Sequence, residues 1–330
     1  MMKAFTMFAA RLAAAGALLL GPAAHAADYP AKPITLVVPF ASGGFVHMVA
    51  LMLSEHMGPL LGQPVVVLNQ PGANGMLAAG AVARAAPDGY TLLLPTASIL
   101  TINPHLYKNV QFDARTDFAP IGQVVNTSNI FVVNPASGIR TFKELVDKAR
   151  SAPDAVSYGS SGTGSIQHIA GEALQEQAKV KLLHVPYKGI GPAITDVASG
   201  NLTTVLADAS SIPFIKSGRL RAIAVSPRAI DELADVPALA DAAAAAGIPG
   251  YAAPALWYGV VAPKGTPAAI VEKLNAALAA TLKKPDVRAK LLAAGAIPPE
   301  DTGSAFLARA IRTDYARYGA QIKSLNISIE

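Results

Sequence analysis

Short apolar runs alternate along the chain with longer segments in which apolar positions recur every three or four residues. Residues 34–38 are a compact, β-branched run, as expected for a strand that is buried on both faces. Apolar residues then recur at helical spacing from Val46 to Met57, and Gly58-Pro59 should end that helix. The same order repeats, with strands expected at 65–68 and 90–94 and a helix at 76–86.

A second series with this pattern starts near residue 130. It predicts strands at 130–133, 156–158, 184–187, 203–206 and 221–225, separated by helices at 141–151, 165–177, 190–198 and 212–217. The last third adds a strand at 256–262 and helices at 267–282, 285–294 and 303–325. Strands that alternate with helices indicate an α/β fold with mostly parallel sheets. The 330 residues suffice for about two such domains.

The first 26 residues have the pattern of an export signal peptide. Lys3 and Arg11 precede an apolar run at 12–20, and Ala24-His25-Ala26 fits the small-x-small cleavage rule. We expect cleavage after Ala26. Cleavage lowers the net charge from +5 to +3, because the segment carries Lys3 and Arg11 but no acidic residue. A membrane anchor is the alternative, but the apolar run is too short to span a bilayer.

The composition excludes several classes of protein. With 52% hydrophobic and only 15% charged residues, the chain can bury a core and is not disordered. It has no cysteine, which excludes disulfides, thiolate metal sites, thiol nucleophiles and a lipid anchor on cysteine. The uncharged stretch 242–263 contains six glycines and prolines, so a spanning helix is not expected there. Basic residues are scattered, which argues against nucleic acid as a partner.

Two glycine-rich loops are the first candidates for a binding site. In open α/β sheets ligands bind beyond the carboxyl ends of strands, and the helix starts that follow attract anions. The candidates are Ala41, Ser42, Gly43 and Gly44 in the first loop, and Ser160, Ser161, Gly162, Thr163, Gly164 and Ser165 in the second. A plain tight turn is the alternative for the first loop. The second lacks the lysine of a nucleotide-binding loop and is no nucleophile elbow, which favours a neutral cradle for a carboxylate.

Several side chains near these loops are further candidates, each with a structural alternative. His47 and His168 lie in the first turns of the two following helices, where they either face a cleft or serve the fold. Asp208 and Ser210 follow a predicted strand and either bind a ligand or cap a helix. Trp257 lies with Tyr258 in a predicted strand, and this aromatic pair either stacks on a planar ligand or packs in the core. No histidine pair has metal-ligand spacing, and no metal or cofactor is expected.

Ordered motifs along the whole mature chain resemble one family. They include Tyr29-Pro30-Ala31-Lys32-Pro33-Ile34, Val38-Pro39-Phe40-Ala41-Ser42-Gly43-Gly44, Pro87-Asp88-Gly89-Tyr90, His184-Val185-Pro186-Tyr187-Lys188-Gly189 and Ala262-Pro263-Lys264-Gly265-Thr266-Pro267. Together they resemble the Bug/TctC family, the periplasmic substrate-binding proteins of tripartite tricarboxylate transporters. Because the matches are colinear, they are more specific than any single glycine loop.

The resemblance implies a two-lobed, type II-like periplasmic-binding-protein fold that closes over a small organic acid. It implies a first lobe at 28–125 plus 252–330, a second lobe at 126–251, and crossing strands between them. The carboxylate would lie between the loops at 42–44, 96–98 and 160–165. Asn74, Thr96, Ser98 and Tyr187 complete the candidate ligand-binding residues. We expect a periplasmic monomer without a lipid anchor or cofactor, which delivers its ligand to membrane permease subunits.

One part of the first loop departs from the family pattern. Where the family has a small residue, an aspartate and an arginine, this chain has Phe45, His47 and Leu51. We hypothesise a more apolar or aromatic pocket, or a ligand whose second anionic group lies near His47, because imidazole can donate to a carboxylate. Loss of binding at this position is the alternative.

Two other functions compete with transport. In a sensor, the closed protein would dock on a receptor kinase, and the sequence does not distinguish this from delivery to a permease. A periplasmic hydrolase would need a nucleophile, a base and an orienting group within reach of one another, and no motif supplies them.

Overall fold

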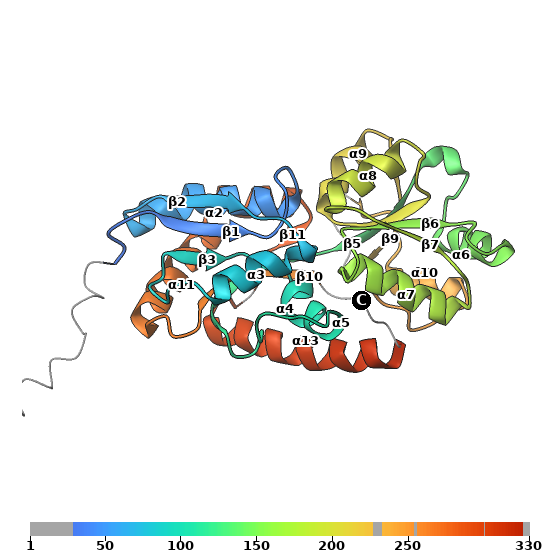
Figure 1. The fold of residues 1–330 in the computed structure, drawn as a ribbon. Coiled ribbons are helices and arrows are strands. Elements are labelled where there is room, and N and C mark those ends of the chain that lie inside the picture. Colours follow the sequence, from blue (N-terminus) through green and yellow to red (C-terminus); the bar gives the residue numbers. More distant parts are fainter. Residues whose placement is uncertain (1–28, 227–232, 254–255, 300, 326–330) are drawn as a thin grey trace, which may run out of the picture.

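The computed structural model describes residues 29–226, 233–253, 256–299 and 301–325. The expected signal peptide at 1–26 lies outside the described residues. Figure 1 shows two lobes side by side, each with its own sheet and its own helices. The predicted two-lobed α/β architecture is therefore confirmed.

The first sheet has the strand order β11-β4-β10-β3-β1-β2. Its strands are β1 (Ile34–Val38), β2 (Val65–Asn69), β3 (Thr91–Leu93), β4 (Phe118–Thr127), β10 (Leu256–Pro263) and β11 (Ala296–Ile297). β1 pairs in parallel with β2 and β3, whereas β10 runs antiparallel to both β3 and β4. The strands β1 and β3 contribute fully buried apolar side chains, as the sequence pattern predicts.

The second sheet has the order β7-β6-β8-β5-β9. Its strands are β5 (Asn129–Val133), β6 (Ser157–Ser160), β7 (Leu183–Pro186), β8 (Thr204–Ala207) and β9 (Arg221–Ser226). β6 is parallel to β7 and β8, and β5 is antiparallel to β8 and β9.

The two sheets share one plan. The order β2-β1-β3-β10-β4 in the first sheet corresponds to β7-β6-β8-β5-β9 in the second. In both, the fourth position is taken by a strand of reversed direction, β10 or β5. The reversed strands, β5 and β10, are those that enter from the other lobe, and only Ser128 separates β4 from β5. Both sheets are therefore mixed. β1, β2 and β3, and likewise β6, β7 and β8, pair in parallel, as the sequence pattern predicts, whereas β10 and β5 pair antiparallel with their neighbours, and β11 pairs antiparallel with β4.

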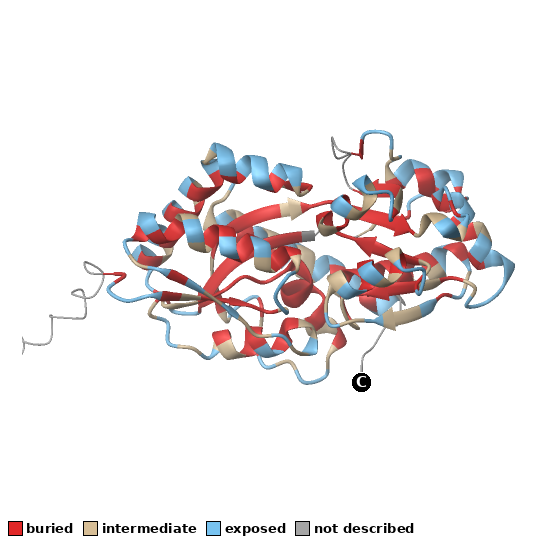
Figure 2. Cartoon of the chain, turned by 90° about the horizontal axis from the view of Figure 1, so that it is seen from above, coloured by how far each residue is buried: buried red, intermediate tan, exposed pale blue. Residues whose placement is uncertain are grey.

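Helices cover both sheets, with their apolar sides inward (Figure 2). The first lobe contains α2 (Phe45–Leu61), the 3-10 turn η3 (Ala73–Gly75), α3 (Met76–Ala83), α4 (Ala97–Thr101), α5 (Asn103–Leu106), α11 (Ala268–Lys283), α12 (Pro285–Ala293) and α13 (Ser304–Leu325). The second contains η4 (Pro135–Ser137), α6 (Phe142–Ser151), α7 (Ile166–Ala178), α8 (Ile190–Ala198), η5 (Ala209–Ser211), α9 (Ile212–Lys216) and α10 (Leu239–Ala245). α13 packs on β4 and α4, and also contacts α7 of the second lobe.

Local sequence signals explain where several helices begin and end. α2 continues through Gly58-Pro59, where we expected it to end, and stops at Leu61; its C-cap Gly62 has a left-handed φ of 76°, which suits glycine. α6 begins with a capping box, in which the Thr141 side chain accepts from the backbone of Glu144 and the Glu144 side chain bonds back. Buried strands and helix faces take up much of the 52% of residues that are hydrophobic. Among the described helices, none is both long and apolar enough to cross a bilayer.

Candidate functional site

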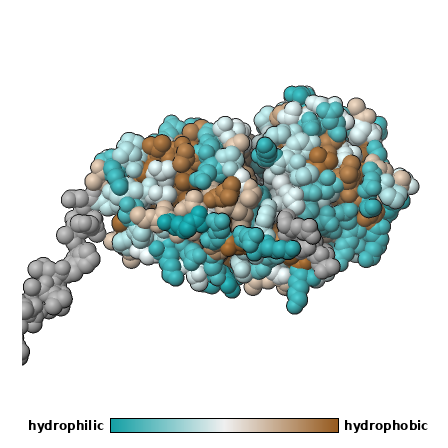
Figure 3. Space-filling view, in the orientation of Figure 1, coloured by the Kyte–Doolittle hydropathy of each residue, from teal (hydrophilic) through white to brown (hydrophobic). Residues whose placement is uncertain are grey.

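A cavity of about 360 Å³ lies where the carboxyl ends of strands from both sheets face each other. Its lining comes from the loops after β1, β2, β3, β6, β7 and β8 and from β10: Phe40, Ala41, Ser42, Gly43, Gly44, Phe45, Val46, His47, Asn74, Thr96, Ser98, Ser161, Ile166, Gln167, Lys188, Gly189, Ile190, Gly191, Pro192, Asp208 and Tyr258. Figure 3 shows the furrow that separates the lobes at the surface. This cavity is the candidate ligand pocket.

The loop after β1 gives the pocket a backbone surface. Gly43 has a φ of 91°, which favours glycine, and a side chain on Gly43 or Gly44 would point into open space. Gly44 is the N-cap of α2, and because it has no side chain it cannot cap the helix. The N–H groups of the first turn of α2 are therefore not capped by that residue, and the positive end of a 17-residue helix lies at the pocket.

Polar and aromatic groups of the first lobe flank this loop. Thr96 and Ser98 are buried, and Thr96 is the N-cap of α4 without a side-chain bond. The rings of Phe45 and Tyr258 pack with their centroids 5.5 Å apart. His47 also lines the pocket, and its buried Nδ1 has no hydrogen-bond partner among the described residues. The aromatic wall fits the apolar pocket hypothesised from the departing loop.

Asn74 reaches the pocket from an unusual backbone conformation. Its φ of 49° and ψ of 41° are left-handed. Asn74 Nδ2 donates to Asn103 Oδ1 over 3.2 Å, and Asn103 Nδ2 donates to the Asn74 carbonyl over 3.1 Å. Asn103 is fully buried, so this reciprocal pair fixes Asn74 at the cavity wall. The sequence did not single out Asn103, since its role depends on a contact 29 residues away.

The second lobe contributes two walls. In the first, Ser161 Oγ donates to Gln167 Oε1 over 2.9 Å, and Ile166 starts α7. The second is the loop 188–192 at the start of α8, whose N-cap Gly189 has no side-chain cap bond. We did not predict Lys188 to Pro192 or Gln167 as site residues. The loop 188–192 nevertheless has the pattern that identified residues 39–44, a glycine turn between a strand and a helix start.

Asp208 serves both as a cap and as part of the pocket lining. Its Oδ1 accepts hydrogen bonds from Ser210 N over 3.0 Å and from Ser210 Oγ over 2.5 Å. The side chain is only 4% exposed, and this burial raises the pKa of the Asp208 carboxyl. Burial, together with the charge of Asp208, also raises the pKa of Tyr258 well above its usual value.

Nine predicted site residues lie outside the pocket lining: Ser160, Gly162, Thr163, Gly164, Ser165, His168, Tyr187, Ser210 and Trp257. Trp257 is 3% exposed and donates from Nε1 to Asp314 Oδ2 over 2.7 Å. Successive strand residues face opposite sides of a sheet, so its neighbour Tyr258 faces the pocket instead. Tyr187 donates its hydroxyl to Asp196 over 2.7 Å within the second lobe.

The glycine loop at 161–165 is supported from behind by a buried network. Ser165 caps α7 by accepting from His168 N, and His168 Nδ1 accepts from Gly164 N over 3.2 Å. The rings of His168 and His184 stack with centroids 4.3 Å apart, and His184 Nε2 lies 2.7 Å from Ser160 Oγ. Both histidines therefore support the fold, which for His168 is the structural alternative given above.

This environment keeps the two histidines neutral. Burial lowers the pKa of His168 to about 4. The pKa of His184 is also lowered to about 4, mainly by burial and to a lesser extent by the neighbouring His168. The negative charge of Glu172 opposes this shift. Ser160 is completely buried, so its bond to His184 does not present a nucleophile to the pocket.

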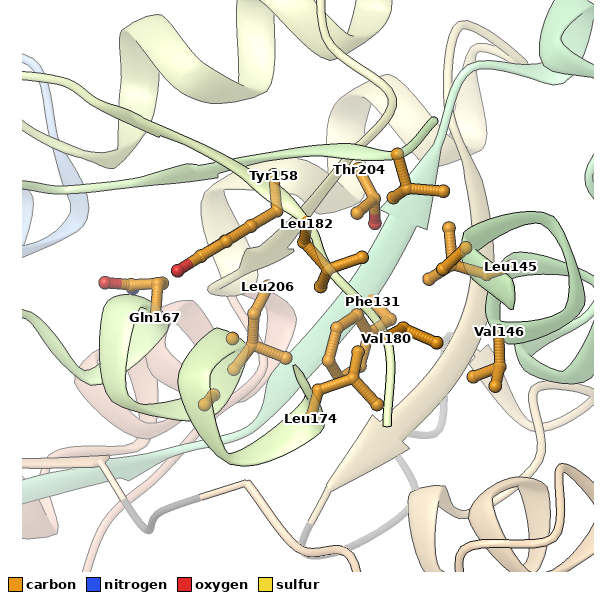
Figure 4. A pocket seen from close by; sticks show the side chains of 14 residues that line it. Phe131, Leu145, Val146, Tyr158, Gln167, Leu174, Val180, Leu182, Thr204 and Leu206 are labelled. Atoms are coloured by element: carbon orange, nitrogen blue, oxygen red, sulfur yellow. The ribbon is translucent and has the colours of Figure 1, made fainter. Parts of the chain in front are cut away.

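The second lobe also contains a small void, shown in Figure 4, between its sheet and α6 and α7. Its volume of about 20 Å³ is close to the space that one water molecule needs. Leu145, Val146, Leu174 and Leu206 are among its mostly apolar lining residues. The void is too small for an organic ligand and belongs to the core.

The lobes contact each other beside the ligand pocket. Tyr107 of the first lobe donates its hydroxyl to the Thr163 carbonyl of the second over 3.0 Å. A Cβ atom on Gly162 would lie 3.8 Å from Asn74 Oδ1, so the glycine loop rests against the first lobe. Gly162 and Thr163 thus take part in contacts between the lobes, although they do not line the pocket. Within the described part of the chain, no group of three or more His, Asp or Glu side chains could hold a metal ion.

Known proteins resemble this chain over most of its length. It is 36% identical over 260 residues to the UPF0065 protein in the tcbD-tcbE intergenic region of Pseudomonas sp. (strain P51), covering 78% of this chain and 76% of that one. The solved structure of the periplasmic binding protein BugD matches with a TM-score of 0.85 and 32% identity, covering 92% of this chain and 100% of that chain. R. palustris Rpa4515 with adipate matches with a TM-score of 0.84 and 32% identity, covering 91% and 99%.

A family profile agrees with these relatives. Residues 49–327 match the family described as the tripartite tricarboxylate transporter family receptor, TctC. The match spans both lobes and both crossing segments, in accordance with the resemblance in the sequence motifs. The chain therefore belongs to the TctC family of tripartite tricarboxylate transporter receptors.

Proposed function

We propose that this protein captures a small organic carboxylate in the pocket between its lobes and delivers it to the permease subunits of a membrane transporter. The observation that carries the proposal is the set of helix starts at the pocket. Gly44 and Gly189 are the N-caps of α2 and α8, one in each lobe, and neither caps its helix with a side chain. Free N–H groups and positive helix ends bind anions without needing a charged side chain.

The charges at the pocket are consistent with this class of ligand. Lys188 is an exposed cation at the wall of the second lobe, where it can attract an anion from solution. The apolar surface of Phe40, Phe45 and Ile190 accommodates a carbon skeleton. A relative of similar fold, Rpa4515, was solved with adipate, which supports an organic acid here as well.

Lobe closure would retain the ligand. An anion that bridges the first turns of α2 and α8 makes contacts with both lobes only when they are closed, and such contacts shift the population toward closure. We propose residues 28–125 with 252–330 as the first lobe and 126–251 as the second. The crossing segments at Ser128 and after Tyr251 are consistent with that division.

We also propose export to the periplasm as a monomer without a lipid anchor, after removal of residues 1–26. The family and its solved neighbours are periplasmic binding proteins, which supports this location. They are binding proteins and not enzymes, and the buried Ser160 offers no accessible nucleophile. A sensor that feeds a receptor kinase would use the same pocket, so co-purification with permease or kinase subunits distinguishes the two roles.

A thermal-shift panel of mono- and dicarboxylates, including aromatic acids, tests the proposal. A ligand at 100 times its Kd stabilises the native state by about 2.7 kcal/mol, which raises the melting temperature measurably. Gly44→Asp should abolish these shifts, because it places a carboxylate at the start of α2, and Gly44→Ala is its matched control, because alanine has no side-chain acceptor that could cap the helix. The side chain in either variant points into open space, so both should fold. No shift with any acid, or equal shifts in both variants, would contradict anion capture here.

A further inference from the structure

Asp208 is a carboxyl group in a pocket that is proposed to hold another carboxyl group. It follows β8, lines the cavity and is only 4% exposed. Ser210 donates two hydrogen bonds to one of its oxygens, Oδ1. Among the described residues no lysine, arginine or histidine pairs with it, and the adjoining β5 and η5 contain no charged side chain. A negative charge on Asp208 would therefore have no counter-ion.

These surroundings favour the uncharged form of Asp208. Removal of a carboxylate from water without a counter-ion costs more free energy than removal of the neutral acid. The hydrogen bonds from Ser210 favour the charged form, but the effect of burial is larger, so the pKa of Asp208 is raised. Because Oδ1 already accepts both bonds, the proton of the neutral acid belongs on Oδ2, where it is a hydrogen-bond donor.

A bound anion favours the uncharged form of Asp208 further. A sphere with the cavity volume of about 360 Å³ is about 9 Å across, so a carboxylate inside it lies within about 9 Å of Asp208. At an effective dielectric constant of about 20, repulsion between two negative charges at that distance weakens binding about twenty-fold. The ligand also displaces water that would hydrate a charged Asp208. A neutral Asp208 avoids both costs.

Three other titratable groups line the cavity, namely His47 of α2, Lys188 before α8 and Tyr258 of β10. Burial, and next the charge of Asp208, raise the pKa of Tyr258 well above its usual value, so its hydroxyl stays neutral. Lys188 is exposed, and solvent and salt screen its charge. An imidazole changes its charge near neutral pH, so the titration of His47 has to be separated from that of Asp208 by a variant.

We propose that a proton on Asp208 is bound together with the ligand carboxylate, so that the pH controls how tightly the ligand is held. Linkage is reciprocal, because a bound anion that favours the protonated carboxyl is itself bound more tightly by that form. The affinity is therefore highest at low pH, and it falls as the pH rises and Asp208 of the free protein loses its proton. This inference rests on the proposed capture of a carboxylate and adds its regulation.

Isothermal titration calorimetry of the wild type from pH 6.5 to 9 tests the proposal, with adipate, succinate and benzoate as probes. The Kd of the probe that binds most tightly should rise at least about ten-fold over this range, as charge on Asp208 introduces the repulsion. Where the Kd rises, titrations in two buffers of different ionisation enthalpy should show net proton uptake on binding. A Kd that changes by less than about three-fold, or binding without proton uptake, would overturn the proposal.

Asp208→Asn tests whether the proton resides on this residue. The amide is neutral at every pH, keeps the shape of the protonated side chain and still accepts from Ser210 at Oδ1. The variant should have a constant Kd from pH 6.5 to 9 and should bind about ten-fold more tightly than the wild type at pH 9. Asp241→Asn removes an exposed carboxylate from α10 of the same lobe, and this control should keep the wild-type pH dependence. A pH dependence that persists in Asp208→Asn would contradict the proposal.

His47→Gln is the second variant, and it decides the matter even if Asp208→Asn does not fold. Whatever its affinity, its Kd should still rise with pH, because the proton resides on Asp208. Loss of the pH dependence in His47→Gln would assign the proton to the imidazole and overturn the proposal. Silence with all three probes at pH 6.5 would contradict carboxylate capture itself, whereas binding with a flat pH profile contradicts only the bound proton. The two proposals therefore fail in distinguishable ways.

Discussion

Mild acid should destabilise the protein through the stacked pair of His168 and His184. Both side chains are neutral in the folded protein, with pKa values lowered to about 4. In the unfolded chain a histidine titrates near pH 6.5. Between these values the unfolded state binds more protons, so the free energy of unfolding falls as the pH decreases from about 6.5 toward 4.

The magnitude follows from the pKa difference of His168. With values of about 4 folded and about 6.5 unfolded, lowering the pH from 7.5 to 5 costs about 2 kcal/mol of stability. His184, with its pKa also lowered to about 4, contributes a loss of similar size, and protonation of either ring raises the cost of protonating the other, because the ring centroids are 4.3 Å apart. Glu172, 3.7 Å from His168, partly offsets the charge.

Urea unfolding followed by circular dichroism at pH 7.5, 6 and 5 measures this loss. The double variant His168→Asn/His184→Gln keeps a polar group near each bonded nitrogen, at Gly164 and at Ser160, but cannot be protonated. Other acidic groups contribute equally in both proteins, so the difference between the two pH profiles isolates the pair. A double variant that loses as much stability as the wild type between pH 7.5 and 5 would refute this reasoning.

Two further predictions concern packing and closure. Gly171→Ala should lower the free energy of unfolding by about 1–3 kcal/mol, since its Cβ would lie 2.2 Å from the Tyr158 ring. Gly191→Ala is the control, because a Cβ there would meet no atom within 4 Å. Equal urea midpoints for the two variants would contradict the packing argument. Tyr107→Phe should weaken ligand binding by about two- to ten-fold in titration calorimetry, because it removes the inter-lobe bond to Thr163. Tyr187→Phe loses a bond within one lobe and should leave Kd unchanged; equal effects of the two variants would rule out a role in closure.

Local patterns were sufficient for most elements and for the first pocket loop. The helix predicted at 190–198 matches α8, because Gly189 and Gly200 bracket a clear amphipathic run. β4 was not predicted, since Pro120 and Gly122 interrupt its apolar pattern and its pairing with β10 is set by residues more than a hundred positions away. α4, α5 and α10 were also missed, because they are short and lie between breakers.

The pocket lining was harder to predict than the fold, because lining depends on which side of an element faces the other lobe. Trp257 and Tyr258 differ by one position, and the strand alternation alone does not say which of them faces the cavity. His168 lies near the start of α7, but its ring turns to His184 inside the lobe rather than to the pocket. Such choices depend on tertiary contacts that a periodic pattern does not encode.

The placement of the pocket groups in the two lobes indicates what drives closure. The helix starts at Gly44 and Gly189 belong to opposite lobes. Tyr258 lies on β10 of the first sheet and Asp208 follows β8 of the second, so these two side chains also reach the pocket from different lobes. A ligand group that contacts one lobe alone adds the same affinity to the open and the closed form, so it shifts no equilibrium between them. Only an anion that reaches both helix starts favours the closed form, and we therefore expect the ligand carboxylate to drive closure.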